Sequence, residues 1–164
     1  MIQREKKKMS EEAALLRLAS LCAKAEYCTY DIRRKLTSWE LPDGASDRIL
    51  KRLTDEKYVD DSRYAHAFVR SKCRFDKWGR IKISNVLRMK GLDENIIEEA
   101  LTEIDPTASD DTLRQLLAAK VSKISFKNDY DRKAKLIRFA LSRGFTMDAI
   151  SRCLSDINIE QTEN

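Results

Sequence analysis

Residues that interrupt helices are rare in this sequence: four glycines and two prolines occur among 164 residues. Long apolar runs are missing as well, and without roughly 18 consecutive apolar residues a transmembrane helix is excluded. The basic N-terminal stretch MIQREKKK leads directly into acidic residues with no apolar segment between them, which argues against a secretory signal. We therefore expect a cytoplasmic protein without a membrane partner.

Residues that commonly perform catalysis are also scarce. The one histidine, His66, stands beside apolar helical positions, so we expect it to pack or to cap a helix. Neither a G-x-x-x-x-G-K-[ST] loop nor a G-x-G-x-x-G loop occurs, so the usual backbone cradles for nucleotide phosphates are absent. The sequence therefore predicts no enzyme, no small-molecule substrate and no cofactor.

Metal-binding patterns are absent too. The four cysteines are widely spaced, with no C-x-x-C pair and no histidine close by, and we expect reduced thiols that pack in helices as small apolar groups. Asp60 and Asp61 are adjacent, but neighbours on a helix do not face one another. One of the two is expected to cap a helix that begins near Ser62, and no metal site is predicted.

The glycines and prolines lie between segments of helical periodicity, as expected where they mark helix ends. Apolar residues in these segments recur at i, i+3, i+4 and i+7, and no convincing two-residue alternation occurs. This pattern predicts an all-α protein of about nine helices. Thr29 is expected to cap the helix within TYDIRRKLTSW.

The helices group in threes. KISNVLRMKGLDENIIEEALTEI (82–104) matches KLIRFALSRGFTMDAISRCLSDI (135–157) at a constant offset of 53, which pairs Gly91 with Gly144. We expect both glycines to adopt a left-handed conformation, with Asp93 or Thr146 capping the helix that follows. Residues 31–56 form a third, looser copy. A period near 50 with three copies predicts three tandem three-helix repeats in an elongated, curved molecule.

The predicted boundaries follow from this register: a disordered basic tail at 1–9, repeats at 10–58, 59–104 and 105–157, and a polar tail at 158–164, likewise expected to be disordered.

Charge is distributed in two opposed blocks. Between Arg70 and Lys90 there are eight cations and one anion, Asp76, and from Gly91 to Leu113 there are eight acids and no base. Blocks of this kind usually indicate partners. The cations are Arg70, Lys72, Arg74, Lys77, Arg80, Lys82, Arg88 and Lys90.

On a helical wheel, Lys82 and Arg88 are expected to reach solvent when Ile83 faces the core. Five further cations could converge on one surface around Gly79, next to Phe75 and Trp78: Arg70, Lys72, Arg74, Lys77 and Arg80. Cations interleaved with aromatic rings can bind a phosphate backbone and stack on bases. The alternative is a solvated surface on which Trp78 fills a gap between helices. For the two rings taken individually, packing in the core is the favoured interpretation.

A helix-turn-helix DNA reader is the rival interpretation of RIKISNVLRMKGLDENIIEEAL. Its second helix would carry the acidic sequence DENIIEEALTEID into the major groove, where phosphates would repel it. If nucleic acid is contacted, the first helix and the preceding loop make the contact.

The central third of the chain resembles the RecX family of bacterial recombination regulators. The resemblance rests on YVDDSRYAHAFVRSK followed by KWGRIKISNVLRMKGLDENIIEEAL. The matching positions are Tyr58, Val59, Asp60, Asp61, Arg63, Tyr64, Ala65, Phe68, Val69, Arg70, Gly79, Arg80, Ile81, Leu87, Lys90, Gly91 and Leu92. Two departures occur: Arg80 stands where many relatives have proline, and the first repeat has TSWELPDGAS in place of a Lys-Gly turn.

The resemblance implies a non-catalytic regulator of homologous recombination, DNA repair and the SOS response. Such proteins are built from three-helix repeats, bind RecA recombinase filaments on single-stranded DNA, and inhibit their ATPase and strand exchange. Some also bind DNA directly. The candidate surface for recombinase or DNA comprises Arg70, Lys72, Arg74, Lys77, Trp78, Arg80, Lys82, Arg88 and Lys90.

Alternatives to this function stay open at the level of sequence. The basic surface could belong to a stand-alone nucleic-acid-binding protein without a recombinase partner, or the chain could be an adaptor whose charges only keep it soluble. Under the leading interpretation, the acidic helix 94–103 could contact basic loops of the recombinase.

Overall fold

The structure of the protein is a computed structural model that describes the backbone of residues 8–162 and the side chains as far as Ile157. Over that range the chain forms helices and no strand. The helices are α1 (Glu11–Lys24), α2 (Thr29–Ser38), α3 (Ala45–Asp55), α4 (Asp61–Arg74), α5 (Arg80–Met89), α6 (Glu94–Leu101), α7 (Pro106–Val121), α8 (Asp129–Ser142) and α9 (Met147–Thr162).

The two ends of the described residues can be compared with the two predicted tails. Residues 1–7 and 163–164 lie outside the described residues. α9 continues to Thr162, past residue 157 where the last repeat is predicted to end, because no glycine or proline follows Gly144 to stop the helix. The repeat boundaries themselves stay a prediction.

Side-chain caps define several of the helix starts. Asp93 accepts a hydrogen bond from the Asn95 N–H, and Thr146 accepts one from the Ala149 N–H, as predicted. Asp60 caps α4 by accepting from the Arg63 N–H at 3.0 Å, which confirms the capping role expected of the Asp60–Asp61 pair.

The start of α2 differs from the prediction. Cys28 is the residue before the helix, and Thr29 is its first residue. The reason is that carboxylates satisfy the first two backbone N–H groups: Asp31 accepts from the Cys28 N–H, and Asp61, from the next repeat, accepts from the Thr29 N–H at 2.8 Å. Both aspartates of the adjacent pair therefore accept hydrogen bonds from backbone N–H groups at helix starts, Asp60 at α4 and Asp61 at α2.

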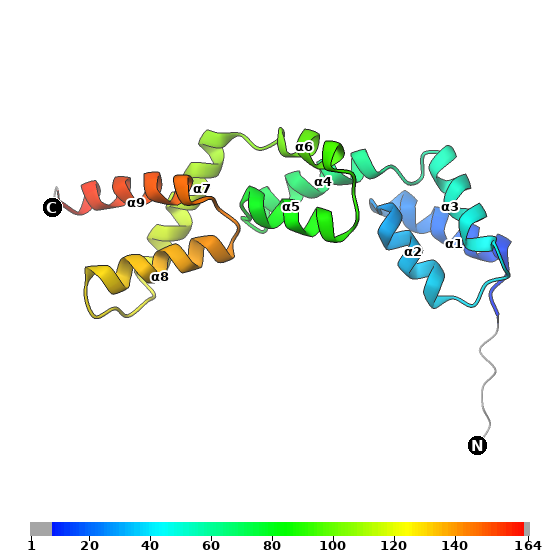
Figure 1. Ribbon diagram of the computed structural model, residues 1–164, viewed down its shortest axis with the longest axis horizontal. Coiled ribbons are helices and arrows are strands. Elements are labelled where there is room, and N and C mark those ends of the chain that lie inside the picture. The colour runs from blue at the N-terminus through cyan, green and yellow to red at the C-terminus, as the bar shows by residue number, and fades with distance from the viewer. Residues whose placement is uncertain (1–7, 163–164) are drawn as a thin grey trace, which may run out of the picture.

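Three buried clusters, one for each group of three helices, form the core. Leu18, Ile32 and Leu53 belong to the first cluster, Ile83 and Leu87 to the second, and the third gathers around Leu113, Leu136 and Ile150. The three groups follow one another in a row, with α4–α6 between α1–α3 and α7–α9 (Figure 1). The molecule is elongated, as the repeat register predicts.

Adjacent repeats meet at two joints of different construction. At the first joint, Lys90 Nζ lies 2.9 Å from Asp31 Oδ1 and donates to the Tyr64 hydroxyl at 2.8 Å. Burial alone would lower the pKa of Lys90, but these two hydrogen bonds outweigh it and the pKa lies above its usual value. Side chains therefore hold the first repeat to the second.

At the second joint, backbone meets backbone. The Gly79 N–H donates to the Arg143 carbonyl at 2.7 Å, and the Ile81 N–H donates to the Gly144 carbonyl at 2.9 Å. A Cβ atom at Gly79 would overlap the Gly144 carbonyl, and one at Gly144 would overlap the Cβ of Lys82. Glycine is required at both positions for this close approach. Gly91 and Gly144 have the predicted left-handed backbone, with φ of 70° and 91°.

Candidate nucleic-acid and partner interface

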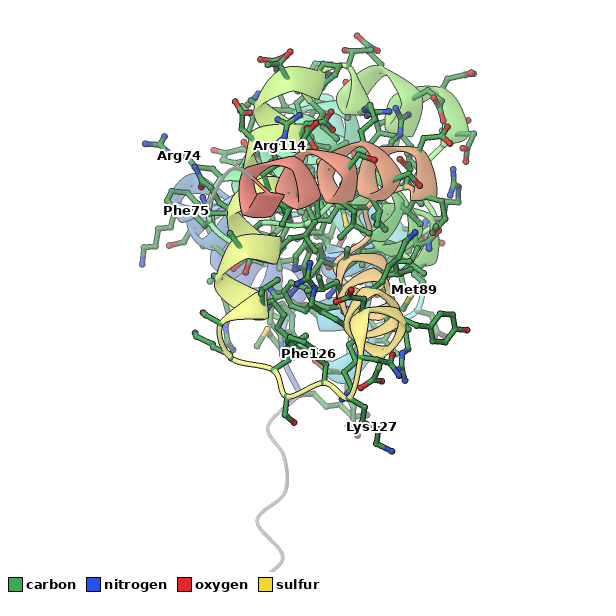
Figure 2. The ribbon with its side chains drawn as sticks, turned by 90° about the vertical axis from the view of Figure 1, so that its left-hand side faces the viewer. Arg74, Phe75, Met89, Arg114, Phe126 and Lys127 are labelled. Carbon is green, nitrogen blue, oxygen red and sulfur yellow. The ribbon has the colours of Figure 1, made fainter. Side chains whose placement is uncertain are left out.

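The nine residues of the candidate surface lie on α4, on the turn after it, on α5 and directly after α5. The structure does not bring all of them together, because α5 has 10 residues and separates Arg80 from Lys90 by about 15 Å. Seen from the end of the molecule that carries α8 and α9, Arg74 and Phe75 project from one edge, and Met89 points to the opposite side (Figure 2).

Half of the eight cations are held in ion pairs within the molecule. Arg88 pairs with Glu94 at 2.7 Å, and Lys90 pairs with Asp31 at the first joint. Arg70 pairs with Glu103 at 2.9 Å, and Lys72 with Asp76 at 3.3 Å. The prediction that Arg88 reaches solvent is confirmed, but its guanidinium already has an internal carboxylate.

The other four cations have no ion pair within residues 8–157, whose side chains the structure describes. We call Arg74, Lys77, Arg80 and Lys82 the unpaired cluster; they come from the end of α4, the turn and the first turn of α5. Lys82 is half-buried, where the helical wheel predicts exposure, because its Cβ lies against the Gly144 turn. Its ammonium lies 4.4 Å from the centre of the Trp78 ring.

The two aromatic residues of this region behave differently. Trp78 packs edge-on against Phe68 at 6.3 Å between ring centres, and Lys72 and Lys82 both lie over its ring. The packing interpretation is confirmed for Trp78. It is wrong for Phe75, whose side chain is 72% exposed because it follows the last residue of α4 and points away from the body of the repeat (Figure 2).

The acidic block is largely used inside the molecule. Asp93 and Asp105 cap α6 and α7. Four more acids form ion pairs: Glu94 with Arg88, Glu103 with Arg70, Asp110 with Arg152, and Asp111 with Arg114. Of the eight acids, only Glu98 and Glu99 have neither role in the described part of the chain. Within the range that the structure describes, four cations of the basic block and two acids of the acidic block therefore have no such role, and the four cations form the unpaired cluster near Trp78.

His66 lies beside a carboxylate, and the four cysteines lie in partly or fully buried positions. His66 Nδ1 lies 2.8 Å from Glu103 Oε1, and the hydrogen bonds from His66 and Arg70 lower the pKa of that carboxyl. The four cysteines are free, and burial raises the pKa of each thiol, in the case of Cys28 to about 11. Such thiols stay protonated near neutral pH.

A cleft of about 400 Å³ lies beside the unpaired cluster, between α4 and α7. Its lining includes the apolar residues Trp78, Ile104 and Phe145 together with Arg74 and Lys77. Among the described residues, no group of three or more His, Cys, Asp or Glu side chains could hold a metal ion. No helix within the described range is long and apolar enough to cross a membrane.

One residue of this region was missed at the level of sequence. Arg143 lies at the second joint, where its carbonyl caps α5 and its guanidinium lies 5.4 Å from the centre of the Phe139 ring. The constant offset of 53 that relates the second and third repeats gives the signal that could have found it, since Arg143 is the equivalent of Lys90.

Comparison with known proteins agrees with this architecture. Residues 60–101 match the family model for the second three-helix domain of RecX, and residues 108–154 match the model for its third three-helix domain. A regulatory protein RecX of Prosthecochloris aestuarii is 34% identical over 134 residues, which cover 80% of this chain and 85% of that protein. The RecX protein of Chlorobium phaeobacteroides is 31% identical over 139 residues, covering 84% and 88%.

Other relatives are longer. The matched segment is 60% of the regulatory protein RecX of Clostridium acetobutylicum, at 30% identity. Among solved structures, RecX from Lactobacillus salivarius has the same fold, with a TM-score of 0.79 and 20% identity over 91% of this chain and 97% of that one.

Proposed function

The chain belongs to the RecX family of regulatory proteins, and on that premise we propose that it regulates homologous recombination and DNA repair by binding RecA-type recombinase filaments on single-stranded DNA. Binding inhibits the filament's ATPase and strand exchange, and the chain itself catalyses nothing.

The observation that carries the proposal is the unpaired cluster beside the exposed ring of Phe75. Arg74, Lys77, Arg80 and Lys82 have no internal carboxylate, whereas the other four cations of the block do. Unneutralised cations next to an exposed aromatic ring suit contact with a phosphate backbone or with an acidic protein surface. An elongated row of repeats also suits a filament, because it can gain affinity from several modest contacts along it.

The test is the single-stranded-DNA-dependent ATPase of the RecA recombinase from the same organism, titrated with this protein. We expect the ATPase to fall at substoichiometric protein. An Arg74→Glu/Lys77→Glu variant should need about tenfold more protein, because two unpaired cations become anions. The matched control is Lys123→Glu/Lys133→Glu, which changes the net charge equally at two exposed lysines, one just after α7 and one on α8.

Control and wild type should inhibit alike. An ATPase that never falls, or that falls only in proportion to the DNA removed by binding, contradicts the proposal. If wild type and the Arg74→Glu/Lys77→Glu variant inhibit equally, the protein is still a regulator, but its contacts with the filament lie outside the unpaired cluster.

A stand-alone nucleic-acid-binding protein is the second candidate, favoured by the same cluster. Salt separates the two functions. Binding to phosphates alone weakens steeply as salt rises. Inhibition of the recombinase that persists at salt concentrations where binding to free DNA has been lost identifies the regulator.

A further inference from the structure

The two joints of the molecule use equivalent positions with opposite charge. Aligning Leu36 with Leu87 makes Asp31 the equivalent of Lys82, since each is the third residue of its helix. The offset of 53 makes Lys90 the equivalent of Arg143, each directly after a helix. The acid–base pair of the first joint therefore becomes a pair of cations at the second.

Neither cation at the second joint has a carboxylate partner in the described part of the chain. The first joint closes with a 2.9 Å ion pair between Lys90 and Asp31. At the second joint, the ammonium of Lys82 lies over Trp78 and the guanidinium of Arg143 lies over Phe139. Two cations without a carboxylate partner give the second joint a positive potential, which favours an anion.

The start of α5 adds to this positive potential. The N-terminal end of a helix carries a partial positive charge, which acidic residues in the first turn usually compensate. α5 has no acid in its first turn; it has Arg80 and Lys82 there, and its cap is Gly79. The carbonyls of Arg143 and Gly144 accept hydrogen bonds from the N–H groups of Gly79 and Ile81 at this helix end, so we expect side chains to make the main contacts with an anion.

We propose that the second joint is a phosphate-binding site for single-stranded nucleic acid, in which Lys82 and Arg143 hold one phosphate between the second and third repeats. Lys77 and Arg80 contact neighbouring phosphates, and a base stacks on Phe75. The inference rests on the proposed function only in taking single-stranded DNA as the ligand.

A nucleic acid fits the surface better than an acidic peptide does. Phe75 is 72% exposed beside the cluster, and the Arg74 guanidinium lies 5.3 Å from its ring centre. An exposed ring of this kind can accept the face of any unpaired base, whereas an acidic peptide needs only the cations. Double-stranded DNA offers no free base face, so a single strand is the form that uses both features.

The decisive variant is Lys82→Asp, which restores at the second joint the acid–base pair of the first. It should fold at least as well as wild type, because an acid in the first turn of α5 suits the helix end and Arg143 gains a partner. Binding is measured with the full chain and a fluorescein-labelled oligothymidylate by anisotropy, over a series of salt concentrations and without recombinase.

The expected changes are graded. Each phosphate contact on a single strand contributes about 0.7 to the slope of log affinity against log salt. Lys82→Gln should reduce the slope by about 0.7 and Lys82→Asp by about 1.4, since the new carboxylate also occupies Arg143. Lys133→Asp carries the same net-charge change as Lys82→Asp at an exposed position on α8 and should leave the slope at the wild-type value.

Phe75→Ala should weaken binding about fivefold or more with an unchanged slope, because stacking does not release counterions.

Equal slopes for Lys82→Asp and Lys133→Asp overturn the site, and Lys82→Gln still gives the answer if Lys82→Asp unfolds. Competition by poly-glutamate as strong as that by unlabelled oligothymidylate at equal charge overturns the assignment to nucleic acid. The recombinase titration is a separate measurement. Normal ATPase inhibition by Lys82→Asp together with weakened oligothymidylate binding supports both the regulator and the site. If the wild-type protein binds oligothymidylate but does not inhibit the recombinase ATPase, the result counts only against the proposed function.

Discussion

At the scale of single residues, Gly79 and Gly144 set the distance between the second and third repeats. Gly79 has an ordinary negative φ, so its requirement for glycine comes from contact alone: a Cβ there would overlap the Gly144 carbonyl. Gly91 shows the opposite case, with a φ of 70° and no atom within 4 Å of an added Cβ. The three glycines thus separate the effect of contact from the effect of backbone conformation.

We expect Gly79→Ala to lower the free energy of unfolding by about 2 to 3 kcal/mol, because the overlapping atoms are backbone and the joint must open to relieve them. Gly91→Ala should cost about 1 kcal/mol, the strain of a left-handed alanine alone. Urea denaturation of both variants measures the difference. A Gly79→Ala variant as stable as wild type would show that the second joint is not closed in solution.

At the scale of elements, the first joint depends on the ionisation of Asp31. Burial alone would raise the pKa of its carboxyl, but hydrogen bonds from Lys90 and Cys28 outweigh burial and the pKa lies below its usual value. Its contribution to stability is therefore present above about pH 4 and is lost as the pH falls through the folded-state pKa. The pKa of Lys90 is raised, so its contribution is present at neutral pH and is lost only as the pH rises through the folded-state value.

Asp31→Asn should accordingly cost about 1 to 3 kcal/mol of unfolding free energy at neutral pH, and the difference from wild type should shrink below about pH 4. Asp55→Asn is the matched control, because the Lys51–Asp55 pair has side chains that are 77% and 61% exposed and should contribute little. Urea denaturation at pH 7 and at pH 3 gives both comparisons. A difference that stays constant down to pH 3 would assign the effect to packing and not to charge.

Helices and joints differ in how far the sequence predicts them. The periodicity of apolar residues and the caps at Asp60, Asp93 and Thr146 are local features, and the structure confirms them. Joints bring together residues far apart in the chain, such as Asp31 and Lys90, which are 59 positions apart. Composition cannot show that Lys90 forms an ion pair with a residue so far away in the sequence.

The candidate surface illustrates the same limit. In the sequence the eight cations form one block, but only the fold shows which of them have a carboxylate partner. A helical wheel places both Arg88 and Lys82 away from the buried stripe, and yet Arg88 pairs with Glu94 whereas Lys82 lies over Trp78. The exposure of Phe75 also depends on where α4 ends, which periodicity places only within a few residues.

At the scale of the whole molecule, the proposed contact with nucleic acid and the proposed contacts with the filament depend on different joints. The unpaired cluster lies at the second joint, whereas the position of the first repeat is set at the first joint by Asp31 and Lys90. If the molecule spans several sites on a filament, all three repeats must be held in register for the contacts to add. A short oligonucleotide touches only the second joint and does not depend on that register.

Asp31→Asn should therefore bind a short oligothymidylate as wild type does, but require about three- to tenfold more protein to inhibit the recombinase ATPase, because one group of contacts is no longer held in place. The two assays are run on the same preparation, with Asp55→Asn as the variant that leaves both joints intact. Identical inhibition by Asp31→Asn and wild type would show that the second and third repeats are sufficient for regulation, and that the elongated shape serves another purpose. A loss in both assays would place the first joint within the nucleic-acid contact itself.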